Sequence, residues 1–228
     1  MKLTLHHTRE EGSDVRSFFF KADEPITWKA GQYLHYTLAH PNPDSRKTER
    51  YFTNAAAPHE GFIMLTTRFA GEKSSSFKKA LFAMSIGSTI EATEPEGDFT
   101  VDDYSRPLVC IAGGIGITPF RSILLDLNKK GIALHTDLLY ANRTEDVVYR
   151  QELEDLTAHE STLKIIYFIG DNKIDEAVIR KMYTDLQAPL FLISGPEPMV
   201  EAFEKMLITM GIPDAHIKRD YFPGYDWP

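Results

Sequence analysis

The sequence predicts two domains of different class, an N-terminal antiparallel β-barrel followed by an α/β domain with a doubly wound parallel sheet. Up to about Thr100, short β-type segments are separated by turn residues, which is typical of antiparallel strands. From Pro107 onward, apolar segments alternate with helical ones, and this alternation indicates a parallel sheet covered by helices. The acidic segment 101–106 is the expected linker, so we expect a barrel of the Greek-key type at residues 1–102 and an α/β domain at 106–228.

The barrel is expected to consist of short strands and one helical insert. The expected strands are residues 2–7, 15–22, 33–39, 62–69 and 88–93. A helix is predicted at residues 75–82, because Phe77, Leu81 and Phe82 fall on one face and the preceding serines can cap its start. The polar run 41–48 is expected to be a solvated hairpin loop.

The α/β domain is expected to alternate regularly along the chain. The expected strands are residues 107–112, 135–141, 163–169, 189–194 and 216–222. One helix is expected to begin at Phe120, and three more are expected at residues 149–156, 175–186 and 198–210. In such a sheet, ligands bind beyond the carboxyl ends of the strands. The loops after Ala112, Ala141 and Ser194 are therefore the candidate binding loops.

Composition restricts the classes of partner. The chain has 228 residues, 43% of them hydrophobic, and its 33 acidic and 25 basic residues give a net charge of −8. This charge argues against nucleic acid or an anionic membrane as a main partner, and no apolar run is long enough for a membrane span or signal peptide, so we expect a cytoplasmic protein. With Cys110 as the one cysteine and no metal-ligand spacing among the histidines, we expect no disulfide, no cluster ligated by this chain alone and no metal site.

The segment LVCIAGGIGITP, residues 108–119, is the most informative motif. A buried strand is followed by Gly113, Gly114 and Gly116, after which Thr118 and Pro119 can start a helix. Such a turn lets the phosphates of a ligand lie against main-chain N–H groups at the positive end of a helix. The alternative is a tight turn in an ordinary α/β domain.

Two further loops of the α/β domain carry polar groups. After Ala141, Asn142 and Arg143 can address a ribose hydroxyl or an additional phosphate, the alternative being a solvated loop. After Ser194, a rigid glycine-proline turn opens another helix beside the first glycine turn. Its candidate binding residues are Gly195, Pro196 and Met199.

The barrel contains its own constellation at residues 49–56. Arg50 supplies a forked charge for a phosphate, Tyr51 and Phe52 offer flat faces, and Thr53 offers a hydroxyl. The small residues that follow let a ring approach the backbone. The alternative is a strand without a binding role, with an exposed arginine and a core aromatic. About twenty residues later, a second anion cradle begins a helix, with the candidates Gly71, Lys73, Ser74 and Ser75.

These motifs, in this order, resemble those of the ferredoxin–NADP reductase superfamily, in which a flavin-binding barrel precedes a nicotinamide-nucleotide domain. The resemblance covers nearly the whole chain and implies that Arg50 holds the flavin pyrophosphate, that Phe52 packs on the isoalloxazine, and that Thr53 hydrogen-bonds near its reactive nitrogen. In the pyrophosphate loop, Ser75 fits the expected register better than Ser74. Ser194 stands where many members have a cysteine near the nicotinamide, which implies slower hydride transfer.

The resemblance implies FAD and NAD(P)H as cofactors, with Thr53 and Ser194 as catalytic residues. It assigns cofactor binding to Arg50, Tyr51, Phe52, Thr53, Asn54, Ala55, Gly71, Lys73, Ser74, Ser75, Gly113, Gly114, Gly116, Thr118, Pro119, Asn142, Arg143, Gly195, Pro196, Met199, Phe222 and Tyr225. In the C-terminal tail, Tyr225 or Trp227 could fold over the isoalloxazine as a gate, the alternative being a frayed end.

The implied reaction passes electrons from a nicotinamide nucleotide through flavin to an acceptor. The expected acceptor is a small soluble electron-transfer protein of the ferredoxin or flavodoxin type. The alternatives are a reductase of free flavin or ferric chelates and, in another class, a non-catalytic flavin or nucleotide sensor. NADH is favoured slightly as donor, because Glu145 and Asp146 follow Arg143 closely and would disfavour an additional phosphate.

Overall fold

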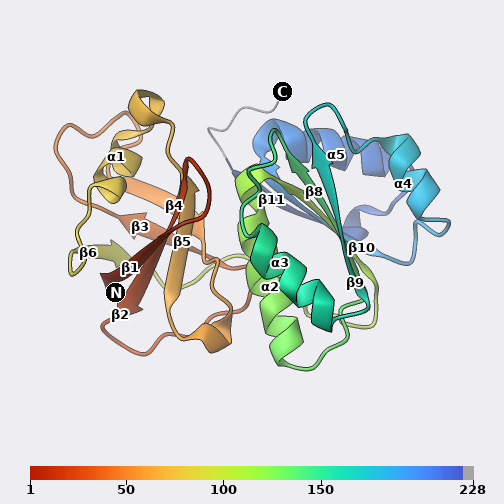
Figure 1. Ribbon diagram of the computed structural model, residues 1–228, viewed down its shortest axis with the longest axis horizontal. Helices are drawn as coiled ribbons and strands as arrows, with labels where there is room; N and C mark the ends of the chain where they lie inside the picture. The colour runs from red at the N-terminus through yellow and green to blue at the C-terminus, as the bar shows by residue number, and fades with distance from the viewer. Residues whose placement is uncertain (223–228) are drawn as a thin grey trace.

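A computed structural model describes residues 1–222 and confirms the predicted fold class, with a barrel domain and an α/β domain side by side (Figure 1). In the barrel domain, six antiparallel strands are arranged in the order β4-β3-β6-β1-β2-β5. The strands are β1 (Lys2–Glu10), β2 (Val15–Ala22), β3 (Tyr33–Thr37), β4 (Glu49–Thr53), β5 (Ile63–Arg68) and β6 (Thr89–Ala92). The predicted helix is α1 (Ser76–Phe82), and short 3-10 helices lie at η1 (Pro58–Glu60) and η2 (Gly71–Lys73).

The two edge strands of this sheet, β4 and β5, meet just beyond the end of β4. The Ala55 N–H donates to the Met64 carbonyl at 2.8 Å, and Asn54 Oδ1 accepts from the Met64 N–H at 2.9 Å. Asn54 and Ala55 are both fully buried at this closure. These contacts give the two residues a structural role, because they satisfy backbone groups that would otherwise lie at an open sheet edge.

In the α/β domain, five parallel strands are arranged in the order β11-β10-β7-β8-β9. The strands are β7 (Leu108–Gly113), β8 (Thr136–Asn142), β9 (Leu163–Ile169), β10 (Leu190–Pro196) and β11 (Ile217–Phe222). The helices are α2 (Ile117–Lys129), α3 (Arg150–His159), α4 (Glu176–Met182) and α5 (Glu197–Thr209), with 3-10 helices at η3 (Gly114–Gly116) and η4 (Asp214–His216). None of the helices within residues 1–222 is both long and apolar enough to cross a membrane.

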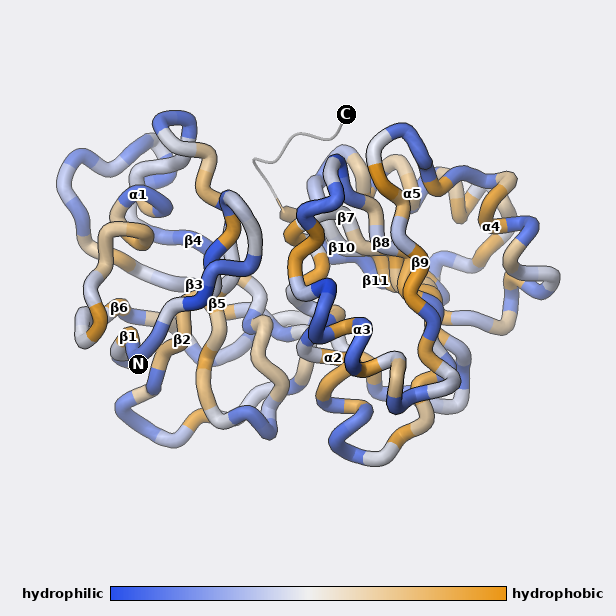
Figure 2. Tube along the Cα trace, in the orientation of Figure 1, coloured by the Kyte–Doolittle hydropathy of each residue, from blue (hydrophilic) through white to orange (hydrophobic). Residues whose placement is uncertain are grey.

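The two faces of the parallel sheet belong to separate apolar cores. Successive residues of β7 and β8 point to opposite faces, where one set packs with α2 and α3 and the other with α4 and α5. Figure 2 shows the corresponding concentration of apolar residues along the strands of this sheet. The core under α2 and α3 continues into the barrel domain through buried residues that include Ala55, Ala56, Met64 and Phe99. The domains are therefore joined by an apolar contact as well as by the linker.

Several element bounds differ from the sequence prediction, and one stretch that was given no bounds proves to be a strand. The α2 helix begins at Ile117 and not at Phe120, because the 3-10 turn η3 leads directly into it and Pro119 is tolerated in the first helical turn. The α4 helix ends at Met182, since Tyr183 turns away and its hydroxyl donates to Asp137 at 2.9 Å. Residues 49–53 form a full strand, β4, paired with β3.

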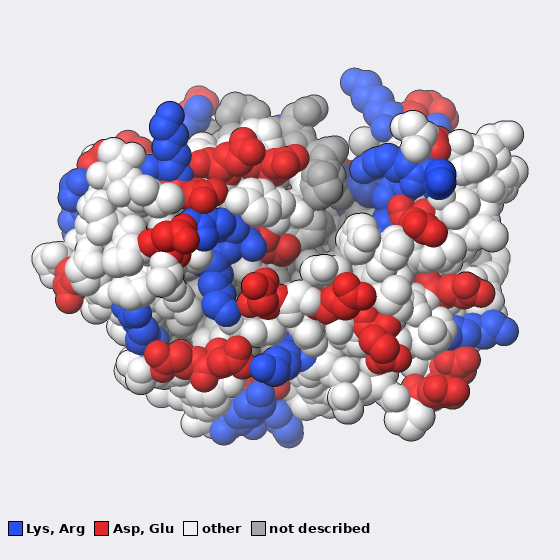
Figure 3. Space-filling view, turned by 180° about the vertical axis from the view of Figure 1, so that it is seen from behind, with Lys and Arg blue, Asp and Glu red and all other residues white. Residues whose placement is uncertain are grey.

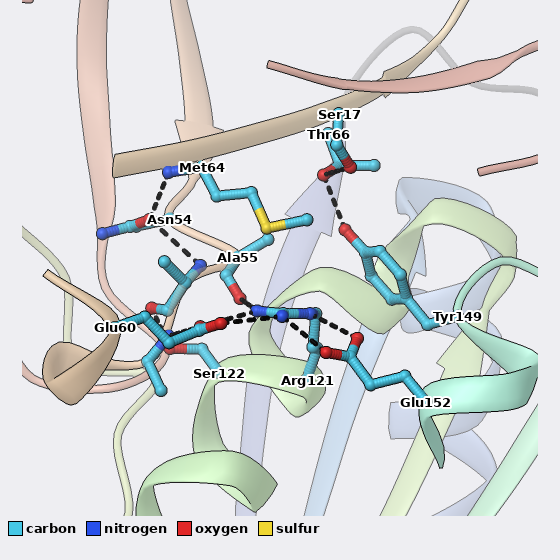
Figure 4. A network of polar contacts seen from close by, with 12 residues as sticks. Ser17, Asn54, Ala55, Glu60, Met64, Thr66, Arg121, Ser122, Tyr149 and Glu152 are labelled. Atoms are coloured by element: carbon cyan, nitrogen blue, oxygen red, sulfur yellow. Dashed lines mark hydrogen bonds and ion pairs between the residues drawn. The ribbon is translucent and has the colours of Figure 1, made fainter. Parts of the chain in front are cut away.

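A buried arginine connects the two domains (Figure 4). Arg121, on α2, donates to Glu60 of the barrel domain at 2.8 and 3.0 Å, to Glu152 of α3 at 2.7 Å and to the Ala55 carbonyl at 2.7 Å. Its side chain is 3% exposed. Burial alone would raise the pKa of Glu60, but the hydrogen bonds and charge of Arg121 outweigh it and lower that pKa.

Replacing Arg121 should therefore destabilise the protein strongly. We expect Arg121→Met to lower the free energy of unfolding by about 3–5 kcal/mol, because two carboxylates would lose their buried partner. In the control Arg68→Met, which breaks the more exposed pair with Asp14, we expect a loss of only about 0–1 kcal/mol. Urea denaturation measures both values, and similar losses in the two variants would contradict this role of Arg121.

Candidate functional site

The largest candidate site is a cleft between the barrel domain and the carboxyl ends of β10 and β11. Its volume is about 660 Å³, which is within the range of small-molecule sites. Of the predicted binding residues, the cleft brings together Arg50, Tyr51, Phe52, Thr53, Ser75 and Phe222. Its wall also contains Tyr33, His35, Arg46, Glu49, Thr66, Lys78, Ile115, Glu197, Asp220 and Tyr221, which the motifs did not identify as site residues.

An exposed aromatic group forms the barrel wall of the cleft. Tyr51 is 62% exposed, and its ring stacks on His35 of the paired strand β3 at 4.2 Å between centroids and an interplanar angle of 12°. Tyr33 meets the same ring edge-on at 5.6 Å. Phe52 is mostly buried and packs against Phe77 in the barrel core. The ring that offers an open face to a ligand is therefore that of Tyr51.

The guanidinium of Arg50 lies in the wall of this cleft with most of its donors already used. Nη2 donates to both carboxylate oxygens of Asp44, at 2.7 and 2.8 Å. Nη1 donates to the carbonyls of Arg46, Lys47 and Glu49. Nε is buried and has no hydrogen-bond partner among residues 1–222.

The expected anion cradle contains the short helix η2 and the start of α1. Ser75 is the N-cap of α1, where its hydroxyl accepts from the Lys78 N–H at 3.3 Å. The Ser74 hydroxyl accepts from the Ala70 N–H at 2.7 Å, and Lys73 is exposed. Of these loop residues, Ser75 lines the cleft, together with Lys78.

The opposite side of the cleft carries an acid on β11. Ser194 is fully buried at the end of β10, and its hydroxyl donates to Asp220 Oδ2 at 3.1 Å. Asp220 lines the cleft but is half-buried, and its removal from solvent raises its pKa to about 6 despite the hydrogen bond from Ser194. Its position next to Ser194 follows from the pairing of these two residues in the parallel sheet. The sequence motifs did not identify Asp220 as a site residue.

The glycine turns meet at the carboxyl ends of β7 and β10. A Cβ at Gly116 would lie 2.2 Å from the Ser194 carbonyl oxygen, and one at Gly113 would lie 2.2 Å from Met199 Sδ. Gly114 has a φ of 51° and open space around its Cα. Gly113 and Gly116 allow the two turns to pack closely, and Gly114 supplies a left-handed backbone conformation. The approach of a phosphate to these glycines stays a prediction.

The other residues of these turns are placed around that contact. Pro196 ends β10 immediately before α5. Gly195 lies close to Gly113, because a Cβ added at Gly195 would be 3.3 Å from the Gly113 Cα. The Thr118 hydroxyl donates back to the Ile115 carbonyl at 3.1 Å, and Pro119 is buried within α2. Ile115 also lines the cleft, so the first glycine turn reaches it directly.

Asn142 and Arg143 line a second, smaller cavity of about 180 Å³ at the carboxyl end of β8, together with Gly170 and Lys173. Asn142 is buried, and its Nδ2 has no hydrogen-bond partner among the described residues. An unsatisfied amide donor and two basic side chains make this cavity suited to a ligand that carries hydroxyl or phosphate oxygens.

The acidic residues expected to disfavour a phosphate at this cavity have other partners. Asp146 Oδ2 accepts from both the backbone N–H and the hydroxyl of Ser13, each at 2.7 Å, and so links the α/β domain to the barrel domain. Glu145 forms an ion pair with Arg150 at 2.9 Å. Neither acid lines the cavity.

The residues predicted as a gate, Tyr225 and Trp227, lie outside the described part of the chain. Phe222, the last described residue, ends β11 and lines the cleft. Within residues 1–222, no group of three or more His, Cys, Asp or Glu side chains is placed to hold a metal ion.

Comparison with known proteins finds relatives for nearly the whole chain. Residues 110–205 match the family described as the oxidoreductase NAD-binding domain. Over 91% of its length, the chain is 28% identical to ferredoxin–NADP reductase B of Sorangium cellulosum, of which it covers 87%. Over 93% of its length, it is 25% identical to a flavohemoprotein of Burkholderia sp. (strain TH2), of which it covers 56%.

The fold has close counterparts among solved structures. The FAD/NAD binding domain of nitric oxide dioxygenase from Vibrio cholerae superposes with a TM-score of 0.85 at 19% identity, covering 97% of this chain and 98% of that one. The chain spans little more than half of the length of the flavohemoproteins that it matches.

A barrel domain is thus followed by an α/β domain that matches oxidoreductase NAD-binding domains, with a cleft between the two. The chain is similar to proteins of the ferredoxin–NADP reductase superfamily, in agreement with the resemblance that the order of its motifs predicted.

The raised pKa of Asp220 predicts a pH-dependent stability. In the folded state the Asp220 carboxyl keeps its proton up to pH about 6, whereas in the unfolded chain it loses the proton near pH 3.8. The protonated carboxyl therefore contributes stability that is fully present below pH 3.8 and is lost as the pH rises to 6. Allowing for partial exposure, we expect the free energy of unfolding to fall by about 1–2 kcal/mol over this range.

Asp220→Asn should remove this component of the pH dependence. Denaturation of both proteins at pH 4 and pH 7 tests it, with Asp171→Asn, an exposed residue of the β9–α4 loop, as the control. Parallel pH profiles for the parent and the Asp220 variant would contradict the raised pKa.

Proposed function

We propose that this protein is an FAD-dependent NAD(P)H oxidoreductase that passes electrons from a nicotinamide nucleotide to a small soluble electron-transfer protein. The observation that carries the proposal is the interdomain cleft, in which the exposed ring of Tyr51 faces the site from one domain and Asp220 from the other. Both sides are supplied by elements that the chain brings together only when the domains are docked.

The residues of the cleft fit a flavin. The Tyr51 face and the Phe222 side chain suit a planar ring, the Thr53 hydroxyl can hydrogen-bond its edge, and Ser75 and Lys78 can approach a phosphate. Arg50 contributes positive charge to the same wall, although Asp44 balances it. When bound, FAD accepts a hydride and releases electrons singly or in pairs.

The chain itself contributes position, exclusion of water and a proton store. The glycine turns at Gly116 and Ser194 would hold a nicotinamide nucleotide against the flavin, since they pack together at the carboxyl ends of β7 and β10 and Ile115 of the first turn lines the cleft. Asp220, hydrogen-bonded to Ser194, can hold or release a proton beside the reacting rings. Cavity residues Asn142 and Arg143 would hold the far end of the nucleotide.

Names of relatives support a protein acceptor. Among them are a ferredoxin–NADP reductase, the reductase subunit of glycine betaine monooxygenase from Chromohalobacter salexigens and the ferredoxin reductase component of 3-ketosteroid-9-alpha-monooxygenase from Rhodococcus rhodochrous. Basic and acidic residues are interspersed on the face shown in Figure 3. The charge of this face therefore favours neither an acidic nor a basic acceptor protein. Reduction of free flavin or ferric chelates is the second candidate, because the cleft is open to small molecules.

Anaerobic reduction tests the reaction. We expect NADH or NADPH to bleach the FAD-loaded protein rapidly, and ferredoxin or flavodoxin to reoxidise it faster than free flavin or a ferric chelate does. Bound FAD that neither nucleotide bleaches would favour the sensor function instead, and faster reoxidation by free flavin would favour the second candidate.

Tyr51 is the sharpest test of the flavin position. We expect Tyr51→Ala to weaken FAD binding by about 0.5–1.5 kcal/mol, because one stacked ring is lost. Tyr104→Ala, which removes an exposed ring of the interdomain segment that does not line the cleft, is the matched control. Flavin fluorescence measures both dissociation constants, and equal values for the two variants would argue against a flavin at Tyr51.

The nucleotide cavity predicts weak discrimination between the two donors. Arg143 and Lys173 both line it, whereas the acids once expected to repel a phosphate are held by Ser13 and Arg150. We therefore propose that NADH is an efficient donor and that NADPH is accepted as well. The ratio of kcat/KM for the two donors should lie within about a hundredfold, or ~2.7 kcal/mol, and a larger preference for either would contradict this.

A further inference from the structure

The loop between β3 and β4 is the solvated hairpin connection that its polar sequence predicts, since the two strands pair antiparallel and most of residues 41–48 are exposed. Within it, Asp44 is only partly exposed and folds back onto Arg50. The Asp44 carboxylate in this loop accepts two hydrogen bonds from Arg50, at 2.7 and 2.8 Å, one from the Ser76 N–H at 3.0 Å and one from the Arg46 N–H at 2.9 Å. A guanidinium and convergent backbone N–H groups are also the donors that proteins use to hold phosphate groups. Asp44 therefore occupies an anion site built by its own chain.

The terminal nitrogens of Arg50 are both engaged in this arrangement. Nη2 lies within hydrogen-bond distance of both Asp44 oxygens, and Nη1 donates to three carbonyls. Nε has no partner in the described chain but is buried. The side chain is 9% exposed although it lines the cleft. A phosphate that approaches Nη2 of Arg50 from the cleft would therefore compete with the Asp44 carboxylate for this nitrogen.

The loop holds Asp44 in place through further contacts. The Ser76 hydroxyl is 2.9 Å from both the Asp44 backbone N–H, which donates to it, and His40 Nε2. Asn42 and Lys47 have positive φ angles of 51° and 58°, an uncommon conformation for residues other than glycine. Two residues in an unfavourable backbone conformation require stabilising contacts in the loop, and these contacts hold the Asp44 carboxylate against Arg50.

We propose that Asp44 is an internal competitor for the flavin pyrophosphate at Arg50 and thereby makes FAD a weakly held, exchanging cofactor of this protein. The inference rests on the proposed function, because it assumes that FAD occupies the cleft. Burial alone would raise the pKa of Asp44, but the hydrogen bond from Arg50 and those from the backbone outweigh it and lower the pKa to about 2. The competing charge is therefore present at every pH at which the enzyme would work.

The test compares the dissociation constants of FAD and riboflavin, measured by flavin fluorescence on the full chain freed of flavin. Riboflavin has the same ring and no phosphate, so it reports on the ring site alone. Asp44→Asn keeps the size of the side chain and one oxygen acceptor but removes the charge. We expect it to tighten FAD binding by about tenfold and to leave riboflavin binding within twofold of the parent.

Two controls separate charge from loop structure. Ser76→Ala removes the hydroxyl that ties the loop to α1 but keeps the Asp44 carboxylate and the Ser76 backbone donor, so FAD binding should not tighten. Asp14→Asn removes a comparably exposed carboxylate, paired with Arg68 away from the cleft, and should leave FAD binding unchanged. Tightening in either control as large as that in Asp44→Asn would overturn the proposal.

Each remaining outcome is decisive. FAD binding that is unchanged or weaker in Asp44→Asn, while riboflavin still binds, would overturn the competitor role and leave the proposed function intact. Weaker binding would instead make Asp44 a partner that positions Arg50 for the flavin. Failure of the parent and every variant to bind either FAD or riboflavin would overturn both the proposed function and this inference.

Discussion

The ion pair network of Arg121 is the constraint on which the cleft depends, because it fixes the barrel domain against the α/β domain. A buried guanidinium between Glu60 and Glu152 tolerates little displacement, since either carboxylate left without its partner would be a costly buried charge. The same cluster reaches the cleft itself. Tyr149, whose ring lies beside Arg121, donates its hydroxyl to Thr66, and Thr66 lines the cleft (Figure 4). The geometry of the site and the docking of the domains are thus parts of one packed unit.

That unit places groups of different chemistry on the two sides of a single cleft. The barrel domain contributes an open aromatic face at Tyr51 and a cation, Arg50, whose charge is balanced by Asp44. The α/β domain contributes Asp220, which stays protonated to unusually high pH because β10 and β11 bury it beside Ser194. This division of groups between the two walls of the cleft suits a flavin. Its ring exchanges a hydride and protons at one edge, while its phosphates lie elsewhere.

Much of the fold could be predicted from sequence, because period-2 segments and strand–helix alternation are local signals of the two domain classes. The site could be predicted only in part. The motif at residues 50–53 lies on a strand that lines the cleft. Which of its aromatic residues faces outward depends on how β4 packs on the barrel, and the structure buries Phe52 and exposes Tyr51. The partner of Arg50 was equally hidden, since a polar loop gives no sign that Asp44 folds back onto it. The packing role of Gly116 depends on the second turn, which is distant in the chain.

The most direct test of the account is the structure of the protein crystallised with FAD and an oxidised nicotinamide nucleotide. The account predicts the isoalloxazine in the interdomain cleft, with the Tyr51 ring against it, the Thr53 hydroxyl at its edge and the nicotinamide approaching from the side of Ser194 and Asp220. A flavin bound outside this cleft, or one bound within it with Tyr51 turned away and the nucleotide at a separate surface, would contradict it.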